Sequence, residues 1–162
     1  MTAPCSPEPS AIEVEEPVAG DLAMAVVVRR GLVLVQRRHR GGIGFVHEFP
    51  GGAVEAGETW ESAASRELLE ETMLREHETV GCFVHRAEGD GRIAFVVFRS
   101  RSDASPRETS ERRRQSFLWL APETIPSHDF HAADRRFIVE ELPSVLRATT
   151  DRGRPTSARE EP

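Results

Sequence analysis

Short apolar runs separated by polar turns occupy most of the chain, and this pattern predicts a sheet of short strands. Each run is rich in Val, Leu, Ile or Phe and is bounded by residues that are common in turns, as is typical of strands. Two pairs of runs are joined by short turns that contain glycine, which indicates two hairpins. The expected strands are residues 24–28, 32–36, 45–49, 80–85, 92–99 and 116–120.

Two segments have the composition of helices. Residues 59–73 are mostly strong helix formers, with neither Gly nor Pro, and Thr59 can serve as the N-cap. Residues 132–146 predict a second helix that Pro143 interrupts or shortens. Because strands and helices do not alternate regularly, the order indicates an α/β or α+β sandwich and not a doubly wound parallel sheet.

The length of 162 residues suits one domain with a hydrophobic core. Residues 1–20 and 149–162 are polar, charged and rich in proline, so we expect both to be disordered around a folded domain at 21–148. No apolar run approaches the roughly 18 residues of a membrane span. The first segment also lacks the basic start and apolar middle of a secretory signal. These features predict a cytoplasmic protein.

Charge and cysteine content exclude some classes of function. A net charge of -6 argues against a protein that binds nucleic-acid polymers, which normally needs a basic surface. The two cysteines, Cys5 and Cys82, provide neither a disulfide framework nor a metal-ligand spacing. Both features fit a soluble protein of a reducing compartment with a small partner.

Three glutamates in the first predicted helix are the main candidates for chemistry. Glu67, Glu70 and Glu71 are spaced i, i+3 and i+4, so they project from one helix face at about 5 to 6 Å. Such a run is ordinarily a solvated surface. Divalent cations would neutralise it, however, and Mg2+ prefers carboxylate oxygens, water and phosphate oxygens. The preceding Gly51-Gly52 allows a close approach of the backbone, and this spacing favours a metal site.

Residues 52–74 resemble the Nudix box. The pattern is Gly52, five residues, Glu58, seven residues, and then Arg66-Glu67-Leu68-x-Glu70-Glu71. The resemblance implies a Nudix-type α/β/α sandwich with a mixed sheet and a loop-helix-loop site for Mg2+ or Mn2+. Met73 departs from the pattern, because the family usually has a glycine there that ends the helix.

The resemblance also implies roles for the residues of the box. Glu67, Glu70 and Glu71 would be metal ligands, together with a backbone carbonyl of Gly52 or its neighbour. Arg66 would orient the glutamates by charge-assisted hydrogen bonds, and Glu58 would brace the loop. These residues form the predicted catalytic set.

Similarity to the MutT-like branch, whose members hydrolyse nucleoside triphosphates to monophosphate and pyrophosphate, extends beyond the box. It is carried by residues 36–38, 48–52 and 129–134. Asp134 stands in the implied base-recognition segment, where an amide would offer a donor and an acceptor but an ionised carboxylate only accepts. The sequence therefore leaves the identity of the nucleotide base open. The substrate-binding residues implied are Arg37, Arg38, Phe49 and Asp134, with Phe49 equally suited to the core.

Two further points stay open at this level. MutT-like proteins supply another acid from the loop before the last strand, but Arg113 stands at that position and Glu111 two residues earlier is the candidate.

The alternatives in function are hydrolysis of another nucleoside diphosphate derivative, such as ADP-ribose, and a non-catalytic domain that senses a nucleotide. We expect a nucleotide as the partner, no nucleic-acid polymer, no membrane, and a monomer or homodimer.

Overall fold

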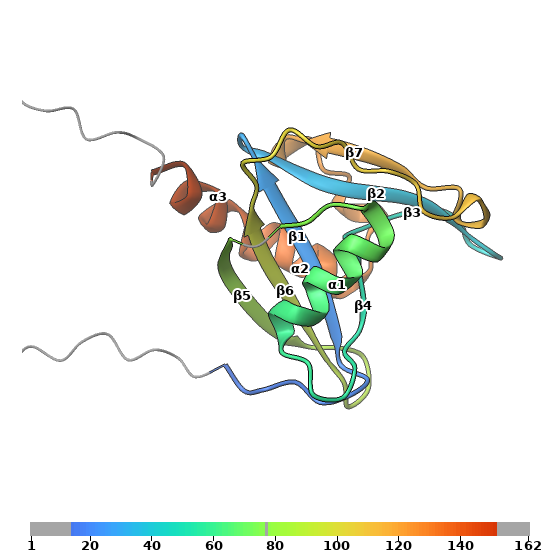
Figure 1. The fold of residues 1–162 in the computed structure, drawn as a ribbon, viewed down its shortest axis with the longest axis vertical. Helices are drawn as coiled ribbons and strands as arrows, with labels where there is room; N and C mark the ends of the chain where they lie inside the picture. Colours follow the sequence, from blue (N-terminus) through green and yellow to red (C-terminus); the bar gives the residue numbers. More distant parts are fainter. Residues whose placement is uncertain (1–13, 77, 152–162) are drawn as a thin grey trace, which may run out of the picture.

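Within residues 14–76 and 78–151, which this computed structural model describes, seven strands form one mixed sheet (Figure 1). All six expected strands are present, and a short strand at 51–53 was not expected. The strands are β1 Leu22–Arg29, β2 Leu32–Arg40, β3 Gly44–Glu48, β4 Gly51–Ala53, β5 Thr79–Arg86, β6 Arg92–Arg99 and β7 Ser116–Leu120.

The strand order combines local hairpins with one long-range pairing. The sheet runs β3-β2-β1-β6-β5, with β4 paired to β1 and β7 paired to β2. The two expected hairpins, β1–β2 and β5–β6, are confirmed as antiparallel pairs. β1 and β6 pair in parallel, with Leu22 opposite Ile93 and Val28 opposite Arg99. This pairing brings the two halves of the chain together.

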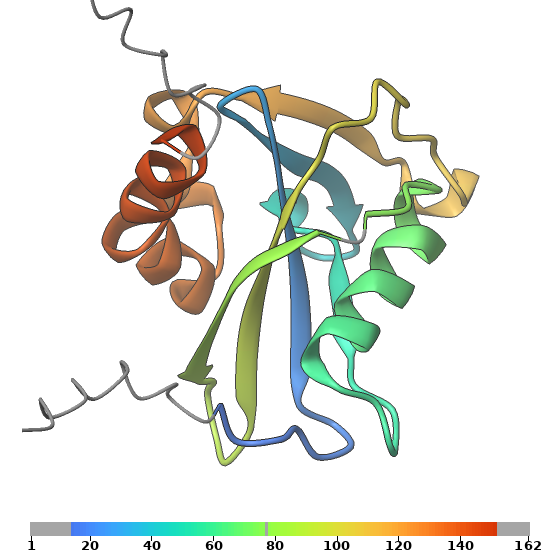
Figure 2. The same cartoon turned by 60° about the vertical axis from the view of Figure 1, so that its left-hand side comes forward.

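Helices cover both faces of the sheet. Helix α1 (Trp60–Thr72) lies on one face, and α2 (Ala132–Glu140) and α3 (Leu142–Asp151) lie on the other (Figure 2). The sandwich expected from the order of elements is therefore confirmed. None of the helices in the described part of the chain is long and apolar enough to cross a membrane.

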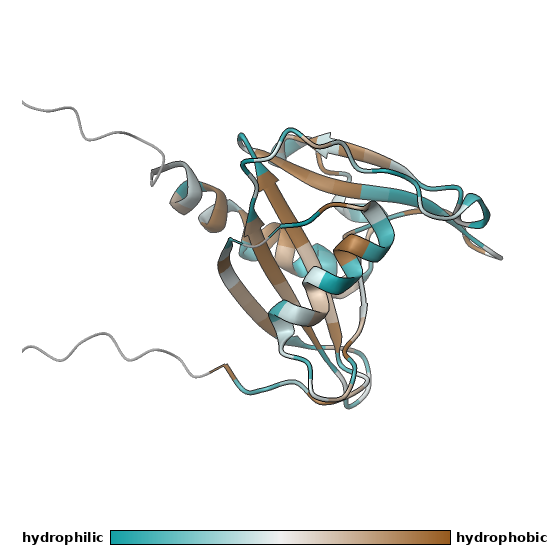
Figure 3. Ribbon diagram, in the orientation of Figure 1, coloured by the Kyte–Doolittle hydropathy of each residue, from teal (hydrophilic) through white to brown (hydrophobic). Residues whose placement is uncertain are grey.

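Each face of the sheet contributes to its own apolar cluster. In β1, Ala23, Ala25 and Val27 pack in the cluster under α1, whereas Val26 and Val28 pack in the cluster under α2 and α3. A strand that is covered on both faces is apolar at successive positions, and β1 and β6 are accordingly hydrophobic along most of their length (Figure 3). Burial on both faces fixes the register of β1 and hence the position of β4 beside it.

The start of α1 is set by a capping box. The Thr59 side chain accepts a hydrogen bond from the Ser62 backbone N–H at 3.1 Å, and Ser62 Oγ accepts from the Thr59 N–H at 2.9 Å. This reciprocal pair satisfies two backbone donors at the helix start. The predicted helix and its N-cap are both confirmed.

Met73 takes the backbone conformation that the usual glycine would supply. Its φ is 63°, in the left-handed region, and its N–H closes the helix on the Leu69 carbonyl at 2.9 Å. Met73 therefore forms the turn that ends the helix in place of the usual glycine, at a cost in backbone strain.

We expect Met73→Gly to stabilise the protein by about 1 kcal/mol, because glycine adopts this conformation without a Cβ penalty. The Met73 side chain is 57% exposed, so little packing is lost. Urea unfolding would measure the change. Met73→Ala is the control, since it removes the same side chain but keeps a Cβ. Equal stability of the two variants would contradict the strain.

The two ends of the domain extend further than the sequence indicated. The second predicted helix is two helices, with Pro143 in the first turn of α3, where its missing N–H costs nothing. Helix α3 continues to Asp151, past the expected boundary at 148. At the other end, Trp60 Nε1 donates a hydrogen bond to the Glu15 carbonyl at 2.9 Å, so this part of the first segment contacts the folded domain. The rest of both predicted tails lies outside the described residues.

Candidate active site

Arg66 is the centre of the box. Its guanidinium donates two hydrogen bonds to the Glu58 carboxylate, at 2.7 and 2.9 Å, and one to the Ala53 carbonyl at 3.0 Å. Its Nη1 lies 2.8 Å from Glu67 and 3.4 Å from Glu70. The hydrogen bonds from Arg66 hold the pKa of Glu58 below its usual value, against the opposing effect of burial. The geometry agrees with the contacts implied for Arg66 and Glu58.

The double glycine is required by close contacts. A Cβ on Gly52 would lie 2.5 Å from Oε1 of Glu67, and one on Gly51 would lie 2.5 Å from the Ala23 carbonyl oxygen. Both distances are shorter than side chains tolerate. A side chain at position 52 would displace the Glu67 carboxylate, whereas a side chain at position 51 would meet the backbone of β1, which cannot move aside.

The three glutamate carboxylates have different partners. Glu67 and Glu70 converge on Arg66, whereas the buried Glu71 carboxylate accepts hydrogen bonds from Gln36 Nε2 at 3.0 Å and from the Gly51 N–H at 3.2 Å. In the part of the chain described, no group of three His, Cys, Asp or Glu side chains is placed to hold a metal by itself. Arg66 thus neutralises part of the charge that the sequence pattern assigned to a cation.

The donor set nevertheless fits a divalent cation that shares its ligands with a substrate. Mg2+ usually binds one or two carboxylates and completes its octahedron with water and phosphate oxygens. Glu67 lies against the glycine backbone and Glu70 is largely exposed on the same turn. Two carboxylates and a nearby backbone carbonyl meet the requirement, provided that phosphates supply the remaining ligands.

A cavity of about 480 Å³ adjoins the box. The double glycine forms part of its wall, so the cavity and the glutamates share one backbone segment. Strands β1, β2, β3 and β6 supply half of the other lining, the turn between β5 and β6 supplies Ala87 and Glu88, and the start of α2 closes one side. The lining residues are Leu22, Met24, Arg38, Arg40, Glu48, Gly51, Gly52, Ala87, Glu88, Ile93, His131, Ala132, Ala133 and Asp134.

Asp134 is the most perturbed group in this cavity. The residue is 3% exposed and its Oδ1 is buried without a hydrogen-bond partner. Burial, and then the negative charge of Glu48, raise the pKa of Asp134 to about 7. A buried acid with an unsatisfied oxygen in a cavity is a candidate for ligand binding.

Because the pKa of Asp134 rises from 3.8 to about 7 on folding, the folded protein binds the proton more tightly than the unfolded chain. Stability is therefore expected to fall as the pH rises from about 4 to about 7, by up to about 1.4 kcal/mol per pH unit. Asp134→Asn should remove this slope and be more stable than the parent protein at pH 8. Urea unfolding across this range would measure it, with the exposed Asp103→Asn as control. Parallel profiles for all three proteins would contradict the prediction.

Two of the four predicted substrate residues line the cavity. They are Arg38, which forms an ion pair with Glu48, and Asp134. Arg37 points to the other face of β2, where its guanidinium lies 3.9 Å from the centroid of the Phe45 ring. Phe49 is fully buried and packs edge-on against Phe95. Arg37 and Phe49 do not line the cavity, because strand alternation and core packing turn both away from it. Their role in substrate binding stays a prediction.

A family model described as the NUDIX domain matches residues 20–140. The chain belongs to the Nudix family. An oxidized purine nucleoside triphosphate hydrolase of Danio rerio is 36% identical over 118 residues, which are 70% of this chain and 73% of that protein. A MutT-like protein of Streptomyces ambofaciens is 34% identical over 103 residues, 62% of each chain. The crystal structure of a MutT Nudix hydrolase from Burkholderia pseudomallei has a TM-score of 0.57 at 23% identity, over 74% of this chain and 95% of that one.

The loop before β7 closes over the end of the Nudix helix. Arg107 N–H donates to the Thr72 carbonyl at 2.9 Å, which satisfies a carbonyl at the end of α1. Glu111, the acid favoured by sequence, is exposed in the 3-10 turn Glu111–Arg113. Glu108 instead accepts a hydrogen bond from the Gln115 N–H at 3.2 Å, next to the start of β7. Sequence position alone does not show which acid of this loop lies near the sheet, because the loop folds back on the end of α1.

Four residues around the Nudix box had no individual role in the sequence-based prediction. Glu48, Arg40 and His131 line the cavity, and Gln36 links Glu48 to Glu71. One signal was available for Gln36, which is a polar residue at the end of an apolar strand. Its burial, however, depends on β3 and β7, which flank β2 on its two sides.

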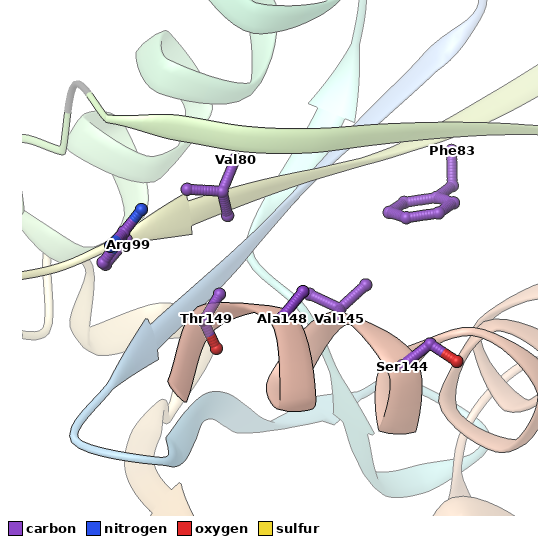
Figure 4. A pocket seen from close by; sticks show the side chains of 7 residues that line it. All are labelled: Val80, Phe83, Arg99, Ser144, Val145, Ala148 and Thr149. Atoms are coloured by element: carbon purple, nitrogen blue, oxygen red, sulfur yellow. The ribbon is translucent and has the colours of Figure 1, made fainter. Parts of the chain in front are cut away.

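A second cavity, of about 200 Å³, lies between β5 and α3 (Figure 4). Its lining contains one charged residue, Arg99, and no carboxylate. This cavity lies on the face of the sheet opposite α1, the helix that carries the box glutamates. Its lining lacks the carboxylates that would hold a cation for phosphate chemistry. The lining residues are Val80, Phe83, Arg99, Ser144, Val145, Ala148 and Thr149.

Proposed function

We propose that this Nudix protein is a Mg2+-dependent enzyme that hydrolyses a nucleoside triphosphate to nucleoside monophosphate and pyrophosphate. One observation carries the proposal: the cavity of about 480 Å³ and the carboxylates of the box share the Gly51-Gly52 segment. A base held in the cavity would extend its phosphates past the glycines to the glutamates. Water attacks phosphorus, and the bond to the leaving phosphate oxygen breaks.

The box supplies the reacting end of the site. Glu67, Glu70, Glu71 and the Gly52 carbonyl would hold Mg2+, or Mn2+ in its place. The cation would neutralise phosphate charge and lower the pKa of the attacking water. Arg66 orients Glu67 and Glu70 through its Nη1. Glu58 fixes Arg66 by two hydrogen bonds. Arg66 and Glu58 thereby keep the metal-binding carboxylates in place while the charge on the phosphates changes.

The cavity supplies the recognition end. Leu22, Met24 and Ile93 form an apolar surface against which a planar base can pack. With a pKa of about 7, the Asp134 carboxyl is present near neutral pH in both forms. Its protonated form donates and accepts hydrogen bonds, as an amide does. This property supports binding of a base that presents adjacent donor and acceptor groups.

The relatives support the same class of substrate. The Danio rerio protein is named as an oxidized purine nucleoside triphosphate hydrolase and the Streptomyces ambofaciens protein as MutT-like. We place oxidised purine triphosphates first among the substrates to be tested, and we propose that the enzyme acts in the cytoplasm.

The test is hydrolysis by the purified protein with Mg2+. The panel contains ordinary and oxidised nucleoside triphosphates, ADP-ribose and dinucleoside polyphosphates, and chromatography identifies the products. Monophosphate and pyrophosphate from a triphosphate are expected. Assays at pH 6 and pH 8 would compare the two forms of Asp134. Cleavage of ADP-ribose or dinucleotides alone would overturn the substrate class but keep the enzyme. Tight binding of one nucleotide without any turnover would favour a sensor.

A further inference from the structure

Gln36 makes hydrogen bonds to two buried carboxylates at once. Its Nε2 donates to Glu71 Oε2 at 3.0 Å and to Glu48 Oε1 at 3.1 Å. Its Oε1 accepts from Gln115 Nε2 at 3.2 Å. The residue is 1% exposed, so each bond forms in a region from which water is largely excluded. Buried amides whose donors and acceptor are all used hold a single orientation.

The position of Gln36 follows from the register of β2. It pairs with Glu48 of β3 on one side and with Phe117 of β7 on the other. Paired residues point to the same face of a sheet, so Gln36 and Glu48 face the same way. That face lies toward the end of α1 that carries Glu71. Strand pairing, and not the box itself, brings an amide to the Glu71 carboxylate.

Gln36 shares the Glu48 carboxylate with two arginines. Glu48 is also held by Arg38 and by Arg40, the latter at 2.9 Å. Among the hydrogen bonds of Glu71, Gln36 and the Gly51 N–H converge on one oxygen, Oε2. An amide orients a carboxylate without adding charge beside it. A cation binding at Glu71 would therefore meet a fixed oxygen with no competing positive charge from position 36.

We propose that Gln36 is a positioning residue of the active site, which acts by holding the Glu71 carboxylate in the orientation that binds the divalent cation. The inference rests on the proposed function of the box. Gln36 does not line the cavity, and its effect would be transmitted through its hydrogen bond to Glu71.

The main test compares Gln36→Met with Gln115→Met. Both substitutions remove a buried amide of the same network by the same change in side chain. The side chain of Gln115 hydrogen-bonds Gln36, so it stands one step further from Glu71. We expect Gln36→Met to weaken Mn2+ binding, measured by electron paramagnetic resonance, by about 10- to 100-fold. It should lower kcat in the same range and change KM for the nucleotide less than about threefold. Gln115→Met should stay within about threefold in all three quantities.

A second variant separates orientation from folding. Gln36→Asn keeps a neutral amide at the same position but shortens the side chain by one methylene group, so the hydrogen bond to Glu71 is lost or lengthened without added charge. We expect a folded protein, judged by circular dichroism and thermal unfolding, that binds Mn2+ at least about 10-fold more weakly. If Gln36 only filled a structural role, a folded Gln36→Asn protein would bind Mn2+ normally. This variant carries the test if Gln36→Met fails to fold.

The outcomes distinguish this inference from the proposed function. Normal Mn2+ binding by a folded Gln36→Asn protein, or equal effects of Gln36→Met and Gln115→Met, would overturn the positioning role. If the parent protein binds Mn2+ but hydrolyses no member of the nucleotide panel, the proposed function fails. The comparison of Mn2+ affinities would still decide the role of Gln36.

Discussion

Glu71→Gln is expected to lower kcat by about 10³-fold or more while the protein remains folded. Loss of groups that only orient metal ligands typically costs about 10- to 100-fold, and loss of a proposed ligand should cost more. The glutamine oxygen can still accept the hydrogen bonds from Gln36 and Gly51 that Glu71 accepts. These two hydrogen bonds are therefore kept, and the change removes one negative charge from the site.

Steady-state kinetics with the best substrate of the panel would measure this effect, and Mn2+ titration would measure the accompanying loss of affinity. Glu61→Gln is the matched control, because Glu61 lies in the first turn of the same helix and is exposed. The control should retain kcat within about twofold. A folded Glu71→Gln protein with normal kcat would remove Glu71 from the metal site.

Phe137→Ala should produce the largest loss of stability, of about 3 to 5 kcal/mol. Phe137 is fully buried in α2. Its ring stacks on Phe95 at a centroid distance of 4.5 Å, and it contacts Phe49 and Phe83. The substitution leaves a cavity at the point where α2 joins the sheet. Since the free energy of unfolding of a domain is only about 5 to 15 kcal/mol, this loss is a large fraction of the total.

Urea unfolding at a fixed temperature would measure the loss in free energy of unfolding caused by Phe137→Ala. Val139→Ala, on the same helix at a side chain that is 63% exposed, should change stability by less than about 0.5 kcal/mol. If Phe137→Ala is too unstable to purify, Phe137→Leu provides a smaller change at the same site. A loss below about 1 kcal/mol for Phe137→Ala would show that α2 is not anchored by this aromatic cluster.

The elements predicted with success are those whose signals are local. The capping box at Thr59, the helix formers of α1 and the turns of the two hairpins each lie within a few residues of the structure that they determine. The spacing from Gly52 to Glu67 likewise describes one contact, because the glycine and the carboxylate meet. Local hydrogen bonds and steric fit can be inferred from neighbouring residues.

Arg37 and Phe49 lie away from the cavity because of the side of the sheet that each residue faces. Alternation along β2 showed that Arg37 and Arg38 point in opposite directions, but the face that meets the cavity was set by β3 and α2. Phe49 follows the end of β3 and was equally suited to core or surface. Its burial is decided by Phe95 and Phe137, which come from later parts of the chain.

The amino-acid sequence by itself determined the helix of the box, its glycines and acids, the hairpins and the membership of the Nudix family. Only the tertiary structure decided that Arg38 and Asp134 share a cavity, that Arg66 gathers Glu67 and Glu70, and that Gln36 reaches Glu71. The first group depends on bonds between near neighbours. The second depends on the pairing of β2 with β3 and β7, and on burial, which arise only when distant segments pack together.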